Sequence, residues 1–475
     1  MSGLCPARAD ASGTSGEAIA YQVDTAHTGD QDGQPFEPPL TRRWSLTFPD
    51  TGNYPAISYP LIASGRVFVT VGDPSGHGGT LYALDAATGA KLWSQRISGS
   101  YMWSTAAYDA GRVFVVNSDG NLQAFDSTAG SPVWSHALGG QTSSPPVALD
   151  GLVYTSWDYG GGTLVALRES DGGVAWSEPV ANGDNSAPAL DASKVYVSYA
   201  GPQTYAFDRG SGSPVWHYAA QGSGGGGQTP ALHGGRVYAR GLQGFDGVYD
   251  ATNGQRVAPL DGGPPPAFAG DTGVFVTYAS VRAQAMSSGT TLWNLSRPDG
   301  ISTPPMIAAN TVYVGDPHGN LDGLDLATGH VVWTANLGVP VDEGADPVWS
   351  GMAAGEGLLV VPAHNTLTAF SGTPVAPGPR PGPTHTAGRD PHLTLVSLRA
   401  HRGHLSVRVQ VARGAKGSLT LVARGRGRHH ARARGHASIY AFNIHLRRAR
   451  WKVTVTFRGR RGWASQRLFR SVVVH

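Results

Sequence analysis

The sequence predicts an all-β protein: an eight-bladed β-propeller over residues 20–372, closed by an N-terminal strand, and then a small C-terminal β-sandwich. Three observations lead to this prediction. A unit of the form A-x-D-x-x-T-G-x-x-x-W recurs along the chain, a short apolar β-run precedes each copy, and the charge changes sign after the last copy. The 66 Gly and 33 Pro, beside 12 Trp and 17 Tyr, are too many turn formers for a helical protein and too many aromatics for a disordered one.

The clearest copy of the unit runs from Ala83 to Trp93. Successive copies are 35 to 46 residues apart, a spacing typical of propeller blades with four short strands each. The Asp position holds Asp85, Asp126, Arg168, Asp208, Asp250, Ala285, Asp325 and Ser371. The Trp position holds Trp93, Trp134, Trp176, Trp216, Ala258, Trp293 and Trp333 in turn. Eight copies predict eight blades.

Local chemistry explains the unit. Asp and Thr side chains accept and donate hydrogen bonds to the backbone of a tight turn, and Gly adopts the positive φ that such a turn needs. The Trp opens the outer strand and is expected to pack on the neighbouring blade, burying ~150 to 250 Å². These tryptophans are therefore predicted to be structural residues that join one blade to the next.

The eighth copy ends at Gly372 without a Trp strand of its own. An unpaired Trp strand, Thr41–Phe48 with Trp44, stands before the first complete copy. We expect this strand to complete the last blade, because ring closure leaves few open sheet edges.

The two ends of the chain differ in chemistry from the propeller. Residues 1–19 are predicted to be a flexible N-terminus without a signal peptide, and no 18-residue apolar run predicts a membrane span. Cys5 is the only cysteine, so no intrachain disulfide can form. Residues 373–390 form a Pro/Gly-rich linker.

The C-terminal part, residues 391–475, is strongly basic. Residues 375–475 hold 21 Lys and Arg against one acid, Asp390, whereas residues 1–374 hold 15 Lys and Arg against 32 Asp and Glu. Alternating apolar residues predict about six strands, which suits a β-sandwich of immunoglobulin-like type. A basic loop is expected to attract polyanions through Arg424, Arg426, Arg428, Arg432 and Arg434. Compositional bias, or docking onto the acidic propeller, would explain the same charge.

The repeated unit closely resembles the pyrroloquinoline-quinone repeat of the quinoprotein alcohol dehydrogenase-like superfamily, where it is called the tryptophan-docking motif. The segment Tyr21–Gly29 looks like the strand and turn that precede the first blade in that family. The resemblance implies the propeller fold and an extracytoplasmic or secreted location. Dehydrogenases of the family bind the quinone and Ca²⁺ in the central channel under a vicinal disulfide, which a chain with one cysteine cannot form. Non-catalytic members bind partners through the faces of the ring.

Candidate ligand-binding residues lie just before the β-runs, where the innermost strands should line the channel. They are Tyr59, Trp103, Ser144, Asn185, Thr229, Thr303, Asp346 and Trp349. Their side chains would otherwise bond to water and to neighbouring strands. Three acids, Asp342, Glu343 and Asp346, are weak candidates for a Ca²⁺ site, and a solvated acidic loop is the alternative.

Together these patterns favour a monomeric, non-enzymatic binding or scaffold protein at the bacterial cell surface or elsewhere outside the cytoplasm. Its expected partner is a protein or a cell-wall component, and no cofactor is expected. One alternative is a dehydrogenase of alcohols or sugars that depends on pyrroloquinoline quinone and calcium, with an atypical channel. A second alternative is attachment to an anionic polymer, such as cell-wall polymer or nucleic acid, through the basic C-terminal part.

Overall fold

The computed structural model describes two compact units, Met1–Ala376 and Pro377–His475. In the first unit the described residues are 16–31, 34, 36–52, 56–101, 104–141, 144–158, 161–183, 185–199, 203–220, 229–239, 247–260, 263–341 and 350–374. In the second they are 394–401, 404–410, 417–424, 428–434, 439–445, 449–459 and 466–474. The regular structure of these residues is β-strand throughout. None of them belongs to a helix long and apolar enough to cross a membrane.

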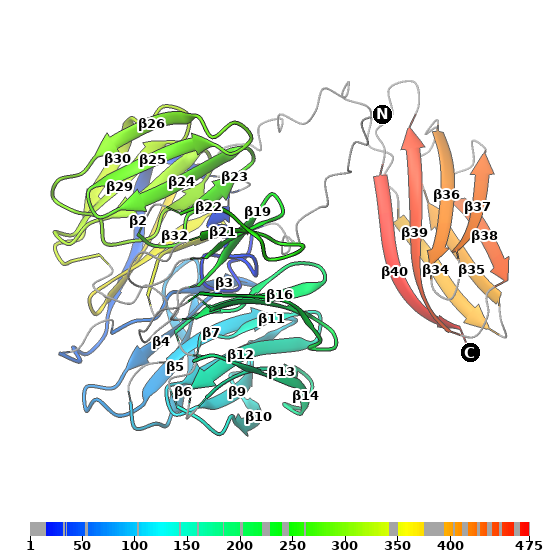
Figure 1. Ribbon diagram of the computed structural model, residues 1–475, viewed down its shortest axis with the longest axis horizontal. Helices are drawn as coiled ribbons and strands as arrows, with labels where there is room; N and C mark the ends of the chain where they lie inside the picture. Colours follow the sequence, from blue (N-terminus) through cyan, green and yellow to red (C-terminus); the bar gives the residue numbers. More distant parts are fainter. Residues whose placement is uncertain are drawn as a thin grey trace. The chain divides into compact units, whose positions relative to one another are not determined.

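The first unit is an eight-bladed propeller, which confirms the predicted fold (Figure 1). Each blade has four antiparallel strands, and the sheet of the seventh blade gains a fifth, parallel strand from the N-terminal segment. The innermost strands are β3 (Leu61–Ala63), β7 (Ser104–Asp109), β11 (Val147–Leu149), β15 (Ala189–Leu190), β19 (Ala231–His233), β23 (Ala267–Ala269), β27 (Met306–Ala308) and β31 (Ala353–Gly355). The second strands are β4 (Arg66–Gly72), β8 (Arg112–Asn117), β12 (Leu152–Asp158), β16 (Lys194–Tyr199), β20 (Arg236–Ala239), β24 (Thr272–Thr277), β28 (Thr311–Gly315) and β32 (Leu358–Ala363).

The two outer positions of each blade carry the repeated unit. The third strands are β5 (Gly79–Asp85), β9 (Asn121–Asp126), β13 (Gly162–Arg168), β17 (Gln203–Asp208), β21 (Gly247–Asp250), β25 (Ser280–Ala285), β29 (Asn320–Asp325) and β33 (Thr366–Pro374). The outermost strands are β6 (Lys91–Ile97), β10 (Pro132–Ala137), β14 (Val174–Val180), β18 (Pro214–Ala219), β22 (Arg256–Pro259), β26 (Thr291–Ser296), β30 (Val331–Asn336) and, in the eighth blade, β2 (Phe36–Thr47).

The ring closes through β2, as the unpaired Trp strand predicted. This N-terminal strand pairs with β33 of the last blade, and Trp44 lies opposite Ala369. In the first blade Trp93 lies opposite Ala83 in the same way. Figure 1 shows β2, in blue, among strands that come from the other end of the propeller sequence. Residues more than 300 positions apart thus form one sheet.

A docking turn, which we define as the turn between the third and outermost strands of a blade, joins most blades to the one before it. In the first blade the Asp85 carboxylate accepts hydrogen bonds from the Thr88 backbone N–H (2.9 Å) and hydroxyl (2.7 Å), and Gly89 has a φ of 72°. The indole of Trp44 lies on Gly89 and donates its Nε1–H to the Ala86 carbonyl at 2.8 Å. The same indole-to-carbonyl bond, 2.8 to 3.1 Å long, is made by Trp93, Trp134, Trp176, Trp216, Trp293 and Trp333.

Residues 16–31 form a plug segment across the inner ends of the blades, on the side of the docking turns. Six innermost strands each donate one backbone N–H, at 2.6 to 2.9 Å, to carbonyls of this segment. The donors are Ile62, Tyr108, Leu190, Leu232, Phe268 and Ile307. The eighth blade bonds to Gly16 through the Glu356 N–H, and Ala20 packs in one apolar cluster with Val147 of the third blade. The plug segment therefore bonds to seven of the eight blades and satisfies donors at the inner sheet edges.

The entry segment differs from the predicted strand and turn. Residues 21–26 form consecutive turns and bends, and only β1 (Asp30–Gln31) is a strand, paired in parallel with β27. Ala18, just before residue 20, is buried and bridged to Ile62 of the first blade. The dark-blue trace of this segment lies near β3 and β19 in Figure 1.

The second unit contains two antiparallel sheets. One has the strand order β34 (Thr394–His401), β35 (His404–Gln410) and β38 (Ile439–His445). The other has the order β37 (Arg428–Arg434), β36 (Gly417–Arg424), β39 (Ala449–Gly459) and β40 (Gln466–Val474). These are seven strands among the described residues, one more than predicted, and the immunoglobulin-like sandwich stays a prediction.

Candidate binding site

The predicted channel hydroxyl groups that the structure describes form hydrogen bonds to neighbouring strands. The Tyr59 hydroxyl of the first blade donates to the Ala106 carbonyl of the second at 2.8 Å. Thr229 of the fifth blade accepts the Ala187 N–H of the fourth at 3.0 Å. Thr303 accepts the Gly315 N–H within its own blade at 2.8 Å. Each of these side chains is buried.

Ser144 joins the third and fourth blades in the same manner. Its hydroxyl donates to the Gly183 carbonyl and accepts the Ser186 N–H, both at 3.1 Å. Asn185, just before Ser186, is half-buried and has a left-handed φ of 56°. These contacts match the structural alternative, in which the hydroxyls bond to neighbouring strands.

Other predicted site residues lie outside the described residues: Trp103, Asp342, Glu343, Asp346, Trp349 and Arg426. Elsewhere in the described ranges, no group of three or more His, Cys, Asp or Glu side chains is arranged to hold a metal ion. The predicted basic loop is in part a strand, since β37 contains Arg428, Arg432 and Arg434 and pairs with β36, which ends at Arg424. Polyanion binding by these arginines stays a prediction.

The centre of the plug segment carries a buried histidine that sequence reasoning did not single out. The His27 ring donates from Nδ1 to the Pro230 carbonyl at 2.9 Å, because a carbonyl can only accept. Burial lowers the pKa of His27 to about 4, so the ring is neutral at pH 7. Tyr21 lies edge-on both to His27 and to Tyr59, with ring centroids 6.0 and 5.4 Å apart. An aromatic cluster thus fills the centre at this end of the ring.

A second missed group lies between the second and third blades. Glu169 is only 4% exposed, and its carbonyl accepts the Nε1–H of Trp134 at 2.8 Å. Burial, and then the neighbouring Asp109 carboxylate, raise the pKa of Glu169 to about 8. The guanidinium of Arg112 also donates to the Glu169 carbonyl. This joint therefore holds a carboxyl group whose pKa lies well above its usual value.

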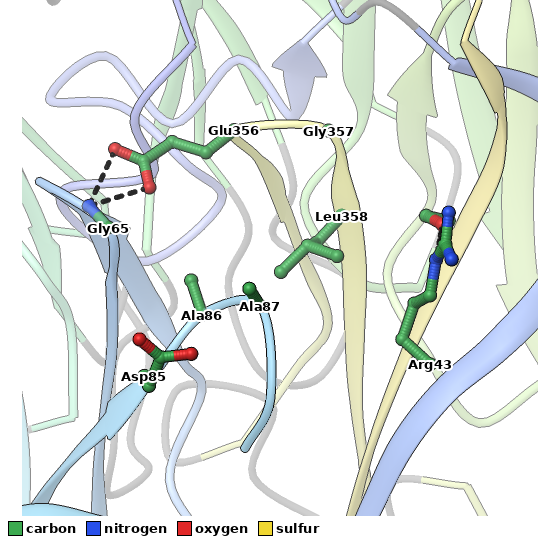
Figure 2. Close-up of a pocket in the computed structure, with 9 residues that line it drawn as sticks. Arg43, Gly65, Asp85, Ala86, Ala87, Glu356, Gly357 and Leu358 are labelled. Carbon is green, nitrogen blue, oxygen red and sulfur yellow. Dashed lines mark hydrogen bonds between the residues drawn. The ribbon is translucent and has the colours of Figure 1, made fainter. Parts of the chain in front are cut away.

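A pocket of about 550 Å³ lies where the ring closes, between the eighth and first blades (Figure 2). In the first blade the Ala86 N–H of the docking turn bonds to the Gly65 carbonyl of the hairpin between the first two strands. The eighth blade lacks a docking turn, because β33 continues to Pro374 in pairing with β2. Its corresponding hairpin, Glu356–Gly357, therefore faces the pocket.

The pocket has opposite charges at its two sides and apolar side chains between them. Figure 2 shows Glu356 at one side, Arg43 at the other, and Ala86, Ala87 and Leu358 between them. The Arg43 guanidinium donates to the Ser371 hydroxyl. Ser371 stands at the position that is Asp in most repeats. The Glu356 carboxylate accepts the Gly65 N–H at 2.9 Å through one oxygen and 3.2 Å through the other.

The two acids of the pocket have shifted pKa values of opposite sign. Hydrogen bonds from Thr88 hold the pKa of Asp85 below its usual value, so this carboxylate is charged. Partial burial raises the pKa of Glu356, and the nearby Glu17 adds to the shift. The plug segment and its neighbour Gln34 fix the Glu356 hairpin, because the Glu356 N–H bonds to the Gly16 carbonyl and the Gly357 N–H bonds to Gln34. The pocket can bind a ligand that has both an anionic and a cationic or N–H-bearing group.

A family model described as the outer membrane protein assembly factor BamB matches residues 41–186, 77–277 and 189–367. The chain belongs to this family. No curated protein matches the sequence. This BamB-family propeller is similar to the crystal structure of BamB from Moraxella catarrhalis, with 19% identity, a TM-score of 0.54, and coverage of 70% of this chain and 97% of that one.

The same fold occurs in two solved dehydrogenases. A europium-containing methanol dehydrogenase is 14% identical with a TM-score of 0.58, over 75% of this chain and 98% of that one. The quinohemoprotein alcohol dehydrogenase of Comamonas testosteroni has the same identity and TM-score, over 75% and 81% of the two chains. At these identities the likeness shows the fold alone. In the BamB-family chain, the hydroxyl groups of the described channel residues bond to adjacent strands, and the plug segment lies across the innermost strands.

Proposed function

We propose that the chain is a non-enzymatic binding or scaffold protein that acts outside the cytoplasm, and that a protein partner docks at the ring-closing pocket. One observation carries the proposal: the chain's own plug segment occupies the inner end of the ring, while the junction of the eighth and first blades keeps an open pocket. The membership of the BamB family supports a protein as the partner.

The chemistry of the pocket suits an extended segment of a partner protein. A carboxylate of the partner would pair with Arg43, which a guanidinium can do through two parallel N–H donors. Backbone N–H groups or a lysine of the partner would face Glu356, and small apolar side chains would pack on Ala86, Ala87 and Leu358. Opposite charges at the two sides would fix the direction in which the segment lies.

Site-specific crosslinking tests this docking. A photoreactive amino acid in place of the exposed Ala87 should give a crosslinked partner in cells of the native host. The charge reversal Arg43→Glu should abolish the crosslink, because the partner's carboxylate would then face another carboxylate. The matched control is Arg42→Glu, which changes the adjacent exposed arginine, and Arg42 is not among the residues that line the pocket. A crosslink that survives Arg43→Glu, or that both variants reduce equally, would contradict docking at this pocket.

A quinone titration tests the enzymatic alternative. The full chain is incubated with pyrroloquinoline quinone and Ca²⁺, and both the spectrum of bound quinone and dye-linked oxidation of alcohols and sugars are measured. We expect neither signal. The appearance of both would overturn the binding proposal in favour of a dehydrogenase.

A further inference from the structure

One docking turn of the propeller has no tryptophan. The chain has Ala258 where the fifth blade should supply the indole for the sixth. All four residues of the outer strand β22, including Ala258, are exposed. The corresponding tryptophans Trp44 and Trp176 are each only 8% exposed.

The receiving half of this joint is nevertheless fully formed. Gly289 has a φ of 73°, within the 71° to 77° range of the glycines in the other docking turns, and its N–H bonds to the Ala285 carbonyl at 2.8 Å. The Met286 N–H bonds to the Asp271 carbonyl, as the Ala86 N–H does to Gly65 in the first blade. The Met286 carbonyl thus occupies the position that accepts the indole N–H in the other joints.

The sixth blade keeps this turn although its own Asp is replaced by Ala285. Asp271, in the neighbouring hairpin of the same blade, supplies the carboxylate that holds the turn. It accepts the Ser287 N–H at 2.8 Å and the Ser287 hydroxyl at 2.7 Å. The geometry that receives an indole is therefore held independently of the missing Trp.

No described residue fills the space above Gly289, where an indole lies in the other joints. A Cβ placed on Gly130 would come within 2.5 Å of Trp93, and one on Gly254 within 2.5 Å of Trp216. Among the residues that the structure describes, a Cβ on Gly289 would meet only the Gln284 Nε2, at 3.9 Å.

We infer that this vacant slot between the fifth and sixth blades binds a tryptophan side chain of a partner protein. The indole would lie on Gly289 and donate its Nε1–H to the Met286 carbonyl. Six docking turns of the same chain, in blades 1–5 and 7, bind an indole in this geometry, which is the reason to expect tryptophan as the occupant. The slot is separate from the ring-closing pocket, so either site can fail without the other.

A peptide titration on the full-length protein tests the slot. The probe is an acetylated and amidated peptide with the sequence of β18, Pro-Val-Trp-His-Tyr-Ala, carrying 5-fluorotryptophan, and binding is followed by ¹⁹F NMR. A peptide with Ala in place of the tryptophan is its control in competition. We expect the fluorotryptophan peptide to bind, and the Ala peptide to compete at least ~10-fold less well.

Two variants decide whether the slot is the binding site. Ala258→Trp should fill the slot from within the chain, raise the Tm by ~3 °C, and weaken peptide binding at least ~10-fold. Val257→Trp adds an indole at the adjacent exposed position and should leave peptide binding unchanged. The inference is overturned if the wild type does not prefer the tryptophan peptide. It is equally overturned if Ala258→Trp gives no rise in Tm, or if its raised Tm comes with unaltered peptide binding.

Discussion

Removing the indole of Trp44 should weaken the ring at the joint where it closes. Trp44 is 8% exposed, its ring lies on Gly89, and its N–H donates to the Ala86 carbonyl at 2.8 Å. Burial of ~150 to 250 Å² at ~25 cal/mol per Å² sets an upper limit of roughly 4 to 6 kcal/mol. Tryptophan-to-alanine changes in cores cost ~3 to 5 kcal/mol, so we expect Trp44→Ala to lower the free energy of unfolding by about that much.

Thermal unfolding followed by circular dichroism and calorimetry measures this loss. Leu92→Ala, on the neighbouring outer strand, is the matched control, because Leu92 is 47% exposed and should contribute less than ~0.5 kcal/mol. Trp44→Phe keeps an aromatic ring but loses the N–H donor, and should cost ~1 kcal/mol for the hydrogen bond in addition to the smaller ring. A loss in Trp44→Ala no larger than that in Leu92→Ala would refute the idea that this indole holds the ring closed.

Three further changes test two other joints between blades and the plug segment. The raised pKa of Glu169 means that the folded state keeps a proton that the unfolded state releases, so stability should fall as pH rises from about 4.5 to about 8, by up to ~1.4 kcal/mol per pH unit. Glu169→Gln should remove this fall in Tm, and parallel pH profiles of the two proteins would count against it. Gly130→Ala should destabilise the protein by ~2 kcal/mol more than Gly111→Ala. Both glycines have a positive φ, but only a Cβ at residue 130 would clash with Trp93. Equal losses of stability in the two variants would contradict a clash with Trp93 as the cause. The Asp24 carboxylate accepts the Ala26 and Thr28 N–H groups in the turn of the plug segment. Asp24→Ala should therefore speed hydrogen exchange of the Leu190 and Leu232 amides at least ~10-fold relative to the Ile62 amide, whose acceptor is Ala18. Uniform exchange rates would show that the turn does not hold the plug segment.

Much of the propeller could be predicted because its information is local and repeated. The Asp, Thr and Gly of a unit act within five residues of chain, and six of the indoles contact the docking turn of the following blade. The missing Trp of the eighth copy and the extra Trp44 together predicted the closure that β2 makes. In the sequence, the replacement of Asp by Ser371 was the one signal for an unusual joint between the eighth and first blades, where the structure has the ring-closing pocket.

The candidate sites were harder to predict, because they depend on which side chains are left available after packing. Ser144 and Thr229 have the composition of a ligand-binding channel, yet their hydroxyl groups bond to backbone groups of adjacent blades. The shifted pKa of Glu169 arises from burial beside Asp109, 60 positions earlier in the chain. No short motif marks either outcome.

The sequence by itself determined the number of blades, the turn that joins them and the strand that closes the ring, since each follows from a short pattern repeated along the chain. Only the tertiary structure decided the course of the plug segment, the pocket between Arg43 and Glu356, and the vacancy above Gly289. The physical reason is that closing the ring brings together residues such as Gly16 and Glu356, which are far apart in the chain. Their contacts depend on the shape of the whole ring, which no local pattern specifies.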